Sequence, residues 1–227
     1  MTKISKKGKA IALVSGGMDS SVAAAIAVKD YDTAFLHINY GQRTEKKELE
    51  CFYKLAEYWD ITRTLVVTLE HFKKIGGSAL TDEKINIPEE LSEKGIPVTY
   101  VPFRNANLLA VAVSWAEVIG ATKIFIGATE EDAAGYPDCR EEFYNAFNQV
   151  IKLGTGKRNI EVVFPLIKMK KVEIIKLGTE LGVPFQYTWS CYKNEDKACG
   201  KCDSCLRRLR AFKEAGIPDP IPYINTT

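Results

Sequence analysis

The feature that most constrains the fold is a regular alternation of short apolar runs with longer helix-like stretches of 11 to 15 residues. Strands that alternate with helices of this length form a parallel sheet covered by helices on both faces. We predict strands at 10–14, 33–38, 63–69, 123–127 and 160–164, and helices at 19–29, 45–59, 105–119, 140–153 and 170–181. The sequence therefore predicts an α/β fold with a doubly wound parallel sheet.

In such a sheet, ligands bind at the carboxyl ends of the strands, an edge that we call the rim. Three polar or glycine-containing loops follow predicted strands: residues 15–20, residues 39–42 and residues 127–129. We expect these three loops to meet at the rim and to form a binding site there.

Residues 70–102 interrupt the alternation. This segment contains Gly76, Gly77, Pro88, Gly95 and Pro97 and shows little periodicity. We interpret it as an inserted loop over the rim or as an oligomer contact, and partial disorder is a third interpretation. We divide the chain into a basic tail at 1–9, a main domain at 10–185 and a C-terminal part at 186–227 that packs on it.

The loop after the first predicted strand, which we call the glycine loop, reads Ser15-Gly16-Gly17-Met18-Asp19-Ser20. Glycines let the backbone approach a ligand, and the free N–H groups and dipole of the next helix attract an anion. An ordinary turn that uses Ser and Gly for geometry is the alternative. A polyphosphate would repel Asp19 unless a divalent cation lay between them, so this residue favours magnesium bound with ATP. The patterns G-x-x-x-x-G-K-[ST] and G-x-G-x-x-G are both absent.

Composition excludes several classes of protein. The chain has 227 residues, 46% of them hydrophobic, which is enough to bury a full core. Its 31 Lys and Arg residues nearly balance 29 Asp and Glu residues, which argues against a nucleic-acid partner. No apolar run approaches the roughly 20 residues of a membrane span, so we expect a cytoplasmic protein with no membrane partner. We interpret the basic stretches 3–9 and 201–213 as a solvated tail and the outer face of a helix.

Four cysteines gather near the C-terminus. Four thiolates complete a tetrahedral zinc shell, and a shell with no open position is structural. An iron–sulfur cluster is the alternative. We expect Gly200 to supply a tight turn, Arg207 and Arg208 to begin a bracing helix, and Cys51 to pack in the core. The four cysteines are Cys191, Cys199, Cys202 and Cys205, spaced C-x7-C-x2-C-x2-C.

The glycine loop resembles the pyrophosphate loop of the ATP pyrophosphatases, which cleave ATP between its α and β phosphates. The same loop occurs in enzymes with many different acceptors, so it leaves the acceptor open. The resemblance implies that ATP contacts Leu13, Val14, Ser15, Gly16, Gly17, Met18, Asp19, Ser20, Ser21, Val22 and Ala23.

Other blocks, at 100–105, 135–140, 188–192 and 199–205, resemble the 7-cyano-7-deazaguanine synthase family. The resemblance runs from about residue 10 to residue 216. It implies a five-stranded parallel sheet of the adenine-nucleotide alpha-hydrolase type with a small zinc-binding C-terminal part. The chain departs from the family pattern at Thr44, where His is common, and at Ser21-Val22, where Thr-Thr is common.

The resemblance implies an ATP-dependent carbon–nitrogen ligase that makes 7-cyano-7-deazaguanine from 7-carboxy-7-deazaguanine and ammonia, for queuosine or archaeosine. The acid is adenylated, ammonia gives an amide, and a second adenylation allows elimination to the nitrile. Family members are expected to be homodimers. Three alternatives are an RNA-thiolating enzyme of this fold, a relative that adenylates another carboxylate, and a non-catalytic nucleotide-binding module.

This chemistry needs cations and positioned amides more than a nucleophilic triad. A carboxylate that accepts from the N–H and amino group of the deazaguanine edge is also required, and Asp138 is our candidate, with Glu131 and Asp132 behind it. Helix capping is the alternative for Asp138, and surface salt bridges are the alternative for the cations. We interpret His37 as packing. The candidate catalytic residues are Ser15, Asp19, Arg104 and Lys171, and the candidate substrate-binding residues are Tyr136, Asp138 and Arg140.

Overall fold

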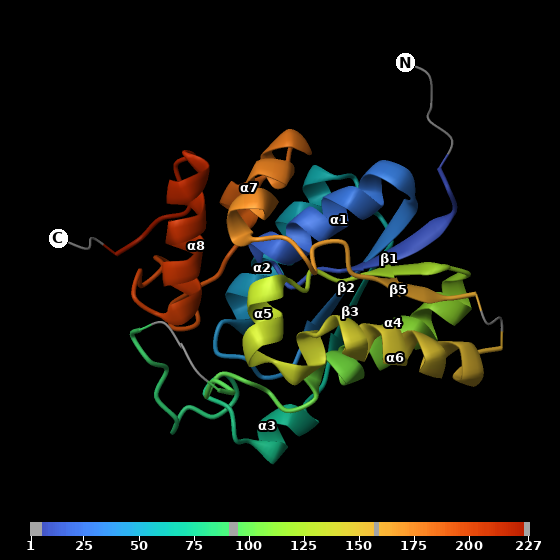
Figure 1. Ribbon diagram of the computed structural model, residues 1–227, viewed down its shortest axis with the longest axis horizontal. Helices are drawn as coiled ribbons and strands as arrows, with labels where there is room; N and C mark the ends of the chain where they lie inside the picture. Colours follow the sequence, from blue (N-terminus) through green and yellow to red (C-terminus); the bar gives the residue numbers. More distant parts are fainter. Residues whose placement is uncertain (1–5, 91–94, 157–158, 225–227) are drawn as a thin grey trace.

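The computed structural model describes residues 6–90, 95–156 and 159–224, so residues 1–5 of the predicted tail lie outside the described residues. At its centre is a five-stranded sheet in the order β3-β2-β1-β4-β5, with every neighbouring pair parallel (Figure 1). Each strand prediction is confirmed to within two residues at either end. The strands are β1 (Lys9–Leu13), β2 (Asp32–Asn39), β3 (Thr64–Thr68), β4 (Lys123–Phe125) and β5 (Glu161–Val163).

The five predicted helices are confirmed, and three more are present. Two of the additional helices are too short to show a helical period in the sequence. None of the described helices is long and apolar enough to cross a membrane. The helices are α1 (Met18–Asp30), α2 (Glu45–Tyr58), α3 (His71–Ile75), α4 (Arg104–Ile119), α5 (Glu130–Gly135), α6 (Glu141–Gly154), α7 (Lys171–Glu180) and α8 (Asp203–Ala215).

Helices cover both faces of the sheet, which confirms the doubly wound prediction (Figure 1). On one face, Ile11 and Leu36 pack in a core with Leu109 of α4 and residues of α6. On the other face, Phe35 packs with Phe52 of α2 and with alanines of α1. Because β1 and β2 are buried on both faces, all their residues after the first are buried, and most of these are apolar rather than alternating with polar ones.

Helices α7 and α8 extend the structure beyond α1. Ile174 of α7 and Phe212 of α8 lie in one core with Val22 of α1. A side chain on Gly178 would come within 2.4 Å of the Phe185 ring, so α7 needs glycine for this close packing. The C-terminal part is therefore joined to the main domain by a continuous core.

Arg208 corrects the interpretation of residues 201–213 as the outer face of a helix. Its side chain is 0% exposed, and its guanidinium pairs with Asp219 at 2.8 Å and donates to Thr188 Oγ1 at 2.8 Å. A charge is buried here because its hydrogen bonds are satisfied. The expectation that Arg207 and Arg208 begin the helix is also wrong, since α8 begins at Asp203.

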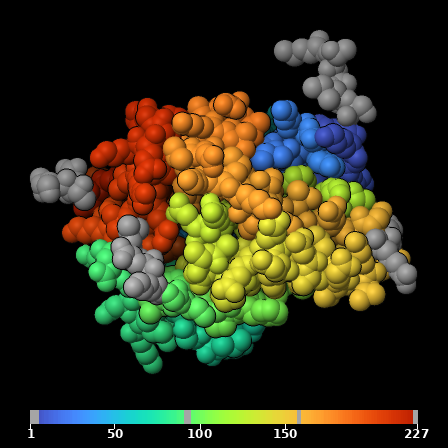
Figure 2. Space-filling model, viewed as in Figure 1, coloured from blue at the N-terminus to red at the C-terminus, as the bar shows by residue number. Residues whose placement is uncertain are grey.

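Segment 70–102 is irregular apart from α3, and residues 91–94 of it lie outside the described residues. It runs beside the C-terminal part, as the green and red surfaces of Figure 2 show. Ala79 and Ile87 pack with Trp189, and Lys193 pairs with Glu89 at 2.8 Å. Leu80, Pro97 and Thr99 line the cavity described below, which supports the interpretation of an insertion over the rim.

Candidate active site

A cavity of about 530 Å³ lies at the rim, within the size range of ligand pockets. The three loops that we expected to meet there all contribute to it, through Ser15, Tyr40, Gln42, Gly127 and Ala128. The convergence predicted from the positions of these loops at the carboxyl ends of parallel strands is therefore confirmed.

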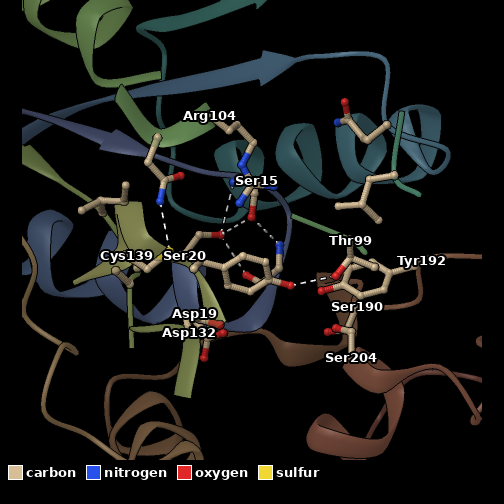
Figure 3. A pocket seen from close by; sticks show the side chains of 18 of the residues that line it. Ser15, Asp19, Ser20, Thr99, Arg104, Asp132, Cys139, Ser190, Tyr192 and Ser204 are labelled. Carbon is tan, nitrogen blue, oxygen red and sulfur yellow. Dashed lines mark hydrogen bonds between the residues drawn. The ribbon is translucent and has the colours of Figure 1, made fainter. Parts of the chain in front are cut away.

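The glycine loop is held open toward this cavity by its own serines (Figure 3). Ser15 Oγ and Ser20 Oγ lie 3.0 Å apart, and the Gly17 amide donates to Ser15 Oγ at 3.2 Å. Gly16 has a φ of +84°, a conformation that favours glycine. Helix α1 begins within the loop, at Met18, and has no side-chain cap, so its first amides are available to an anion.

Asp19, in the first turn of α1, forms a buried ion pair with Lys171. Lys171 Nζ lies 2.7 Å from Asp19 Oδ2 and 3.8 Å from Asp132 Oδ2. Burial raises the pKa of the Asp19 carboxyl, while Lys171 lowers it. Although burial opposes its charge, the Asp132 and Asp19 carboxylates raise the pKa of Lys171 above its ordinary value. Lys171 therefore carries a positive charge into the cavity wall.

The second carboxylate oxygen of Asp19 has no partner. Asp19 Oδ1 is buried and accepts no hydrogen bond from the described residues. An orphaned buried oxygen of this kind calls for an explanation, and a divalent cation is one that uses hard oxygen ligands. The residues present therefore fit a metal ion beside the glycine loop.

Arg104 enters the cavity from the first position of α4. Its Nη1 donates to Tyr40 Oη at 3.0 Å, and its guanidinium lies 5.2 Å from the centre of the Tyr40 ring. Phe103, directly before it, has a φ of +56°. This left-handed residue turns the chain into α4 just where Arg104 reaches the cavity.

The candidate substrate-binding residues divide into two groups. Tyr136 lines the cavity, and its hydroxyl lies 2.9 Å from Thr99 Oγ1. Asp138 is buried outside the lining, where its Oδ2 accepts from the Asn105 amide at 2.8 Å near the start of α4. Arg140 is exposed and also lies outside the lining. The structure thus brings Tyr136 to Ser15, Asp19, Arg104 and Lys171, and the substrate roles of Asp138 and Arg140 stay predictions.

The four cysteines form one cluster. Their sulfur atoms all lie within 4.8 Å of one another, which fits a single metal ion. The amides of Asn194 and Cys199 donate to the Cys191 sulfur, and such bonds stabilise thiolates. Gly200 has a φ of +71°, as expected for the tight turn. This donor set of four soft sulfurs suits zinc or an iron–sulfur centre.

Residues beside the cysteines also line the cavity, and the sequence analysis missed them. Ser190 and Tyr192 flank Cys191, and Ser204 lies between Cys202 and Cys205 (Figure 3). The Trp189 amide donates to the Gly16 carbonyl at 2.8 Å, so the cysteine segment is tied to the glycine loop. Their positions next to the cysteines in the sequence could have indicated that these residues lie near the site.

Glu48 is a further cavity residue that the sequence analysis missed. It lies in the first turn of α2, just after the loop that contains Tyr40 and Gln42. In the sequence, Glu48 is one of several acidic residues on a predicted helix. Only its position a few residues after that loop indicated that it could reach the cavity.

His37 and Cys51 are buried, as predicted. His37 lies between the Val14 carbonyl at 2.8 Å and Asn39 Oδ1 at 3.0 Å, and burial lowers its pKa. Neither residue lines the cavity. The described part of the site therefore contains no histidine for acid–base chemistry.

Comparisons with known proteins identify the relatives of this chain. The family model described as "Queuosine biosynthesis protein QueC" matches residues 9–216. A protein of Koribacter versatilis named 7-cyano-7-deazaguanine synthase is 57% identical over 95% of this chain and 93% of the relative. One of the same name from Chlorobaculum parvum is 57% identical over 95% of this chain and 96% of the relative. The structure of an NMN synthetase from Francisella tularensis is 16% identical, covers 94% of this chain and 79% of that chain, and has a TM-score of 0.51, which supports the fold alone.

Proposed function

The chain belongs to the family of the queuosine biosynthesis protein QueC, and we propose that it makes 7-cyano-7-deazaguanine from 7-carboxy-7-deazaguanine and ammonia with cleavage of ATP. The observation that carries the chemistry is the Asp19 carboxylate, which keeps one buried oxygen unpartnered beside an open glycine loop. Such an oxygen suits a magnesium ion that accompanies ATP and neutralises phosphate charge.

In this proposal the glycine loop holds the diphosphate that leaves. The amides at the start of α1 and the hydroxyls of Ser15 and Ser20 donate to its oxygens. Seven of the eleven predicted ATP-contacting residues line the cavity, and Gly16, Ser21, Val22 and Ala23 lie outside its lining. The seven are Leu13, Val14, Ser15, Gly17, Met18, Asp19 and Ser20. The carboxylate of the base then attacks the α-phosphorus, a bond forms from its oxygen, and diphosphate departs.

Lys171 and Arg104 have the charges that this attack requires. Both line the cavity, so each is placed to neutralise negative charge on the α-phosphate or on the carboxylate of the base. Ammonia then displaces AMP to give the amide. Adenylation of the amide oxygen in a second round allows loss of AMP and two protons to give the nitrile.

We assign a structural zinc ion to Cys191, Cys199, Cys202 and Cys205. Four thiolates leave no open coordination position, and the neighbouring residues build one wall of the cavity. Removal of the metal by a chelator should therefore loosen that wall as well as the C-terminal part. Metal analysis should find one zinc per chain in a colourless protein, whereas iron with a coloured protein would favour the RNA-thiolating alternative.

We further propose a cytoplasmic homodimer that uses ammonia as a substrate and binds no RNA. The near balance of charge and the family resemblance support this assignment. Light scattering of the purified protein gives its mass in solution, and a filter-binding measurement with transfer RNA should detect no tight complex.

The test of the function is the dependence of AMP formation on each substrate. The purified protein is incubated with ATP, magnesium, the carboxylated base and ammonium, and the base products are identified by mass. We expect AMP and nitrile when all are present and no AMP when the base is omitted. Equal AMP formation without the base would refute the proposal.

A further inference from the structure

Glu48 lies against the glycine loop. A side chain added to Gly16 would come within 2.7 Å of the Glu48 carbonyl oxygen, so the first turn of α2 packs directly on the loop. The Glu48 side chain lines the same cavity as Ser15 and Arg104. Glu48 therefore lies in the cavity wall beside the glycine loop.

Glu48 is unlike the other described carboxylates that line this cavity, because each of the others has a salt bridge. Asp19 and Asp132 face Lys171, while Glu131 and Asp203 pair with Arg207 at 2.9 and 2.8 Å. No salt bridge within 4.0 Å involves Glu48 in the described part of the chain. A carboxylate with no fixed cation retains the ability to take up a proton.

Two neutral side chains hold Glu48 in place. Its Oε1 accepts from Thr44 Oγ1 at 2.9 Å, and its Oε2 accepts from Gln42 Nε2 at 3.0 Å. The Gln42 amide is itself fixed, since its oxygen accepts from the Tyr40 backbone amide at 2.8 Å. Each carboxylate oxygen is thus oriented by one donor and keeps a further lone pair for the cavity.

Burial and the neighbouring groups together set the pKa of the Glu48 carboxyl. Burial raises the pKa of its carboxyl to about 7, against the hydrogen bonds from Thr44 and Gln42 and the positive charge of Arg104, while Glu45 raises it further. Burial also raises the pKa of Tyr40 to about 12, so this neighbour stays neutral and does not compete. A carboxyl of this kind exchanges protons near neutral pH, where a general base is most effective.

Ammonia is needed as the free base, but at neutral pH it is present mainly as ammonium. We propose, on the basis of the function proposed above, that the Glu48 carboxylate takes a proton from ammonium in the cavity. The nitrogen lone pair then forms a bond to the adenylated carboxyl carbon, and the carbon–oxygen bond to AMP breaks. The AMP oxygen keeps the electron pair, the nitrogen loses a second proton to solvent, and Glu48 returns its proton to solvent.

The test separates proton removal from adenylation by changing the nucleophile. Hydroxylamine is a weaker base than ammonia and is largely uncharged at neutral pH, so it does not need Glu48. We compare the wild type, Glu48→Gln and the control Glu50→Gln, whose carboxylate lies on the exposed side of α2. Each is assayed with the carboxylated base, ATP and either ammonium or hydroxylamine, and exchange of diphosphate into ATP without a nucleophile measures adenylation.

For Glu48→Gln we expect ammonium-dependent turnover to fall about a hundredfold, in the usual range for loss of a general base. Diphosphate exchange and hydroxylamine-dependent product should stay within a few-fold of the wild type, as should every activity of Glu50→Gln. Wild-type ammonium turnover should rise up to about pH 7 and then level off, whereas the residual turnover of Glu48→Gln should keep rising with the concentration of free ammonia.

Three results would overturn the inference about Glu48. They are an unchanged ammonium rate, an equal loss with both nucleophiles, and a loss of diphosphate exchange as large as the loss of turnover. A wild-type protein that shows no exchange with the carboxylated base would instead refute the proposed function, so the two failures are distinguishable.

Discussion

Two ion pairs in this molecule differ in how many of their carboxylate oxygens accept a hydrogen bond. Arg208 and Asp219 are 0% and 5% exposed, and both Asp219 oxygens accept from Arg208, at 2.8 and 3.0 Å. Lys171 and Asp19 are 8% and 21% exposed, and Asp19 Oδ1 accepts no hydrogen bond from the described residues. The first pair ties the segment around Asp219 to α8 within the C-terminal part, whereas the second leaves one carboxylate oxygen at the cavity free to coordinate a cation. An unsatisfied buried polar atom therefore marks the site better than a buried charge does.

The largest effect should come from Asp19→Asn. The amide is a poor ligand for a divalent cation, so we expect turnover to fall about a thousandfold. Stability should stay within about 1 kcal/mol of the wild type, because Asp132 remains 3.8 Å from Lys171. Steady-state rates and urea denaturation of the same preparation check both parts. A strongly destabilised but active variant would break the comparison.

Asp219→Asn should show the opposite pattern. It leaves the Arg208 charge buried with no other salt bridge in the described part of the chain, which costs about 3 kcal/mol of stability. Urea denaturation measures this loss, and turnover per folded molecule should stay close to that of the wild type at low temperature. Unchanged stability would show that the ion pair between Arg208 and Asp219 does not stabilise the C-terminal part.

Glu48→Gln should change the pH dependence of stability. The pKa of this carboxyl is about 7 in the folded protein against an ordinary 4.5, so between these values the folded state binds more protons than the unfolded state. Stability conferred by the protonated carboxyl is therefore lost as pH rises through this window. At pH 8 we expect Glu48→Gln to be more stable than the wild type by about 1–2 kcal/mol, with little difference at pH 4. Thermal melts at the two pH values test this, and equal gains at both would refute it.

Tyr136→Phe should have the smallest effect. It removes the hydroxyl that lies 2.9 Å from Thr99 Oγ1, a partly buried bond worth about 1 kcal/mol. We expect a modest rise in KM for the base, a nearly unchanged kcat and a slightly lower Tm. A large fall in kcat would mean that Tyr136 acts in the chemistry rather than in the wall of the cavity.

The sequence predicted the sheet because its signals are local. Every strand was predicted from an apolar run. The three loops were predicted to meet because each follows the carboxyl end of a parallel strand. The glycine loop and the cysteine cluster were predictable for the same reason, since each is read from adjacent residues. Lys171 was singled out, but nothing in the sequence showed that it meets Asp19, 152 positions earlier.

Tertiary contacts explain why sequence reasoning misplaced one residue, left the role of a second as a prediction and missed a third. Arg208 sits in a run of charges that is typical of an exposed helix face, and only its pairing with Asp219 allows burial. Asp138 was expected at the substrate, and the structure places its carboxylate on the Asn105 amide. Glu48 looked like an ordinary helix carboxylate, because the packing of α2 on Gly16 is not visible in the sequence.

The stoichiometry of ATP use tests the account most directly. Wild-type protein is supplied with limiting carboxylated base, excess ATP and ammonium, and AMP, amide and nitrile are quantified together. The account predicts two AMP for each nitrile, with the amide as an intermediate that rises and falls. One AMP for each product with amide alone at the end, or AMP in the absence of the base, would contradict it.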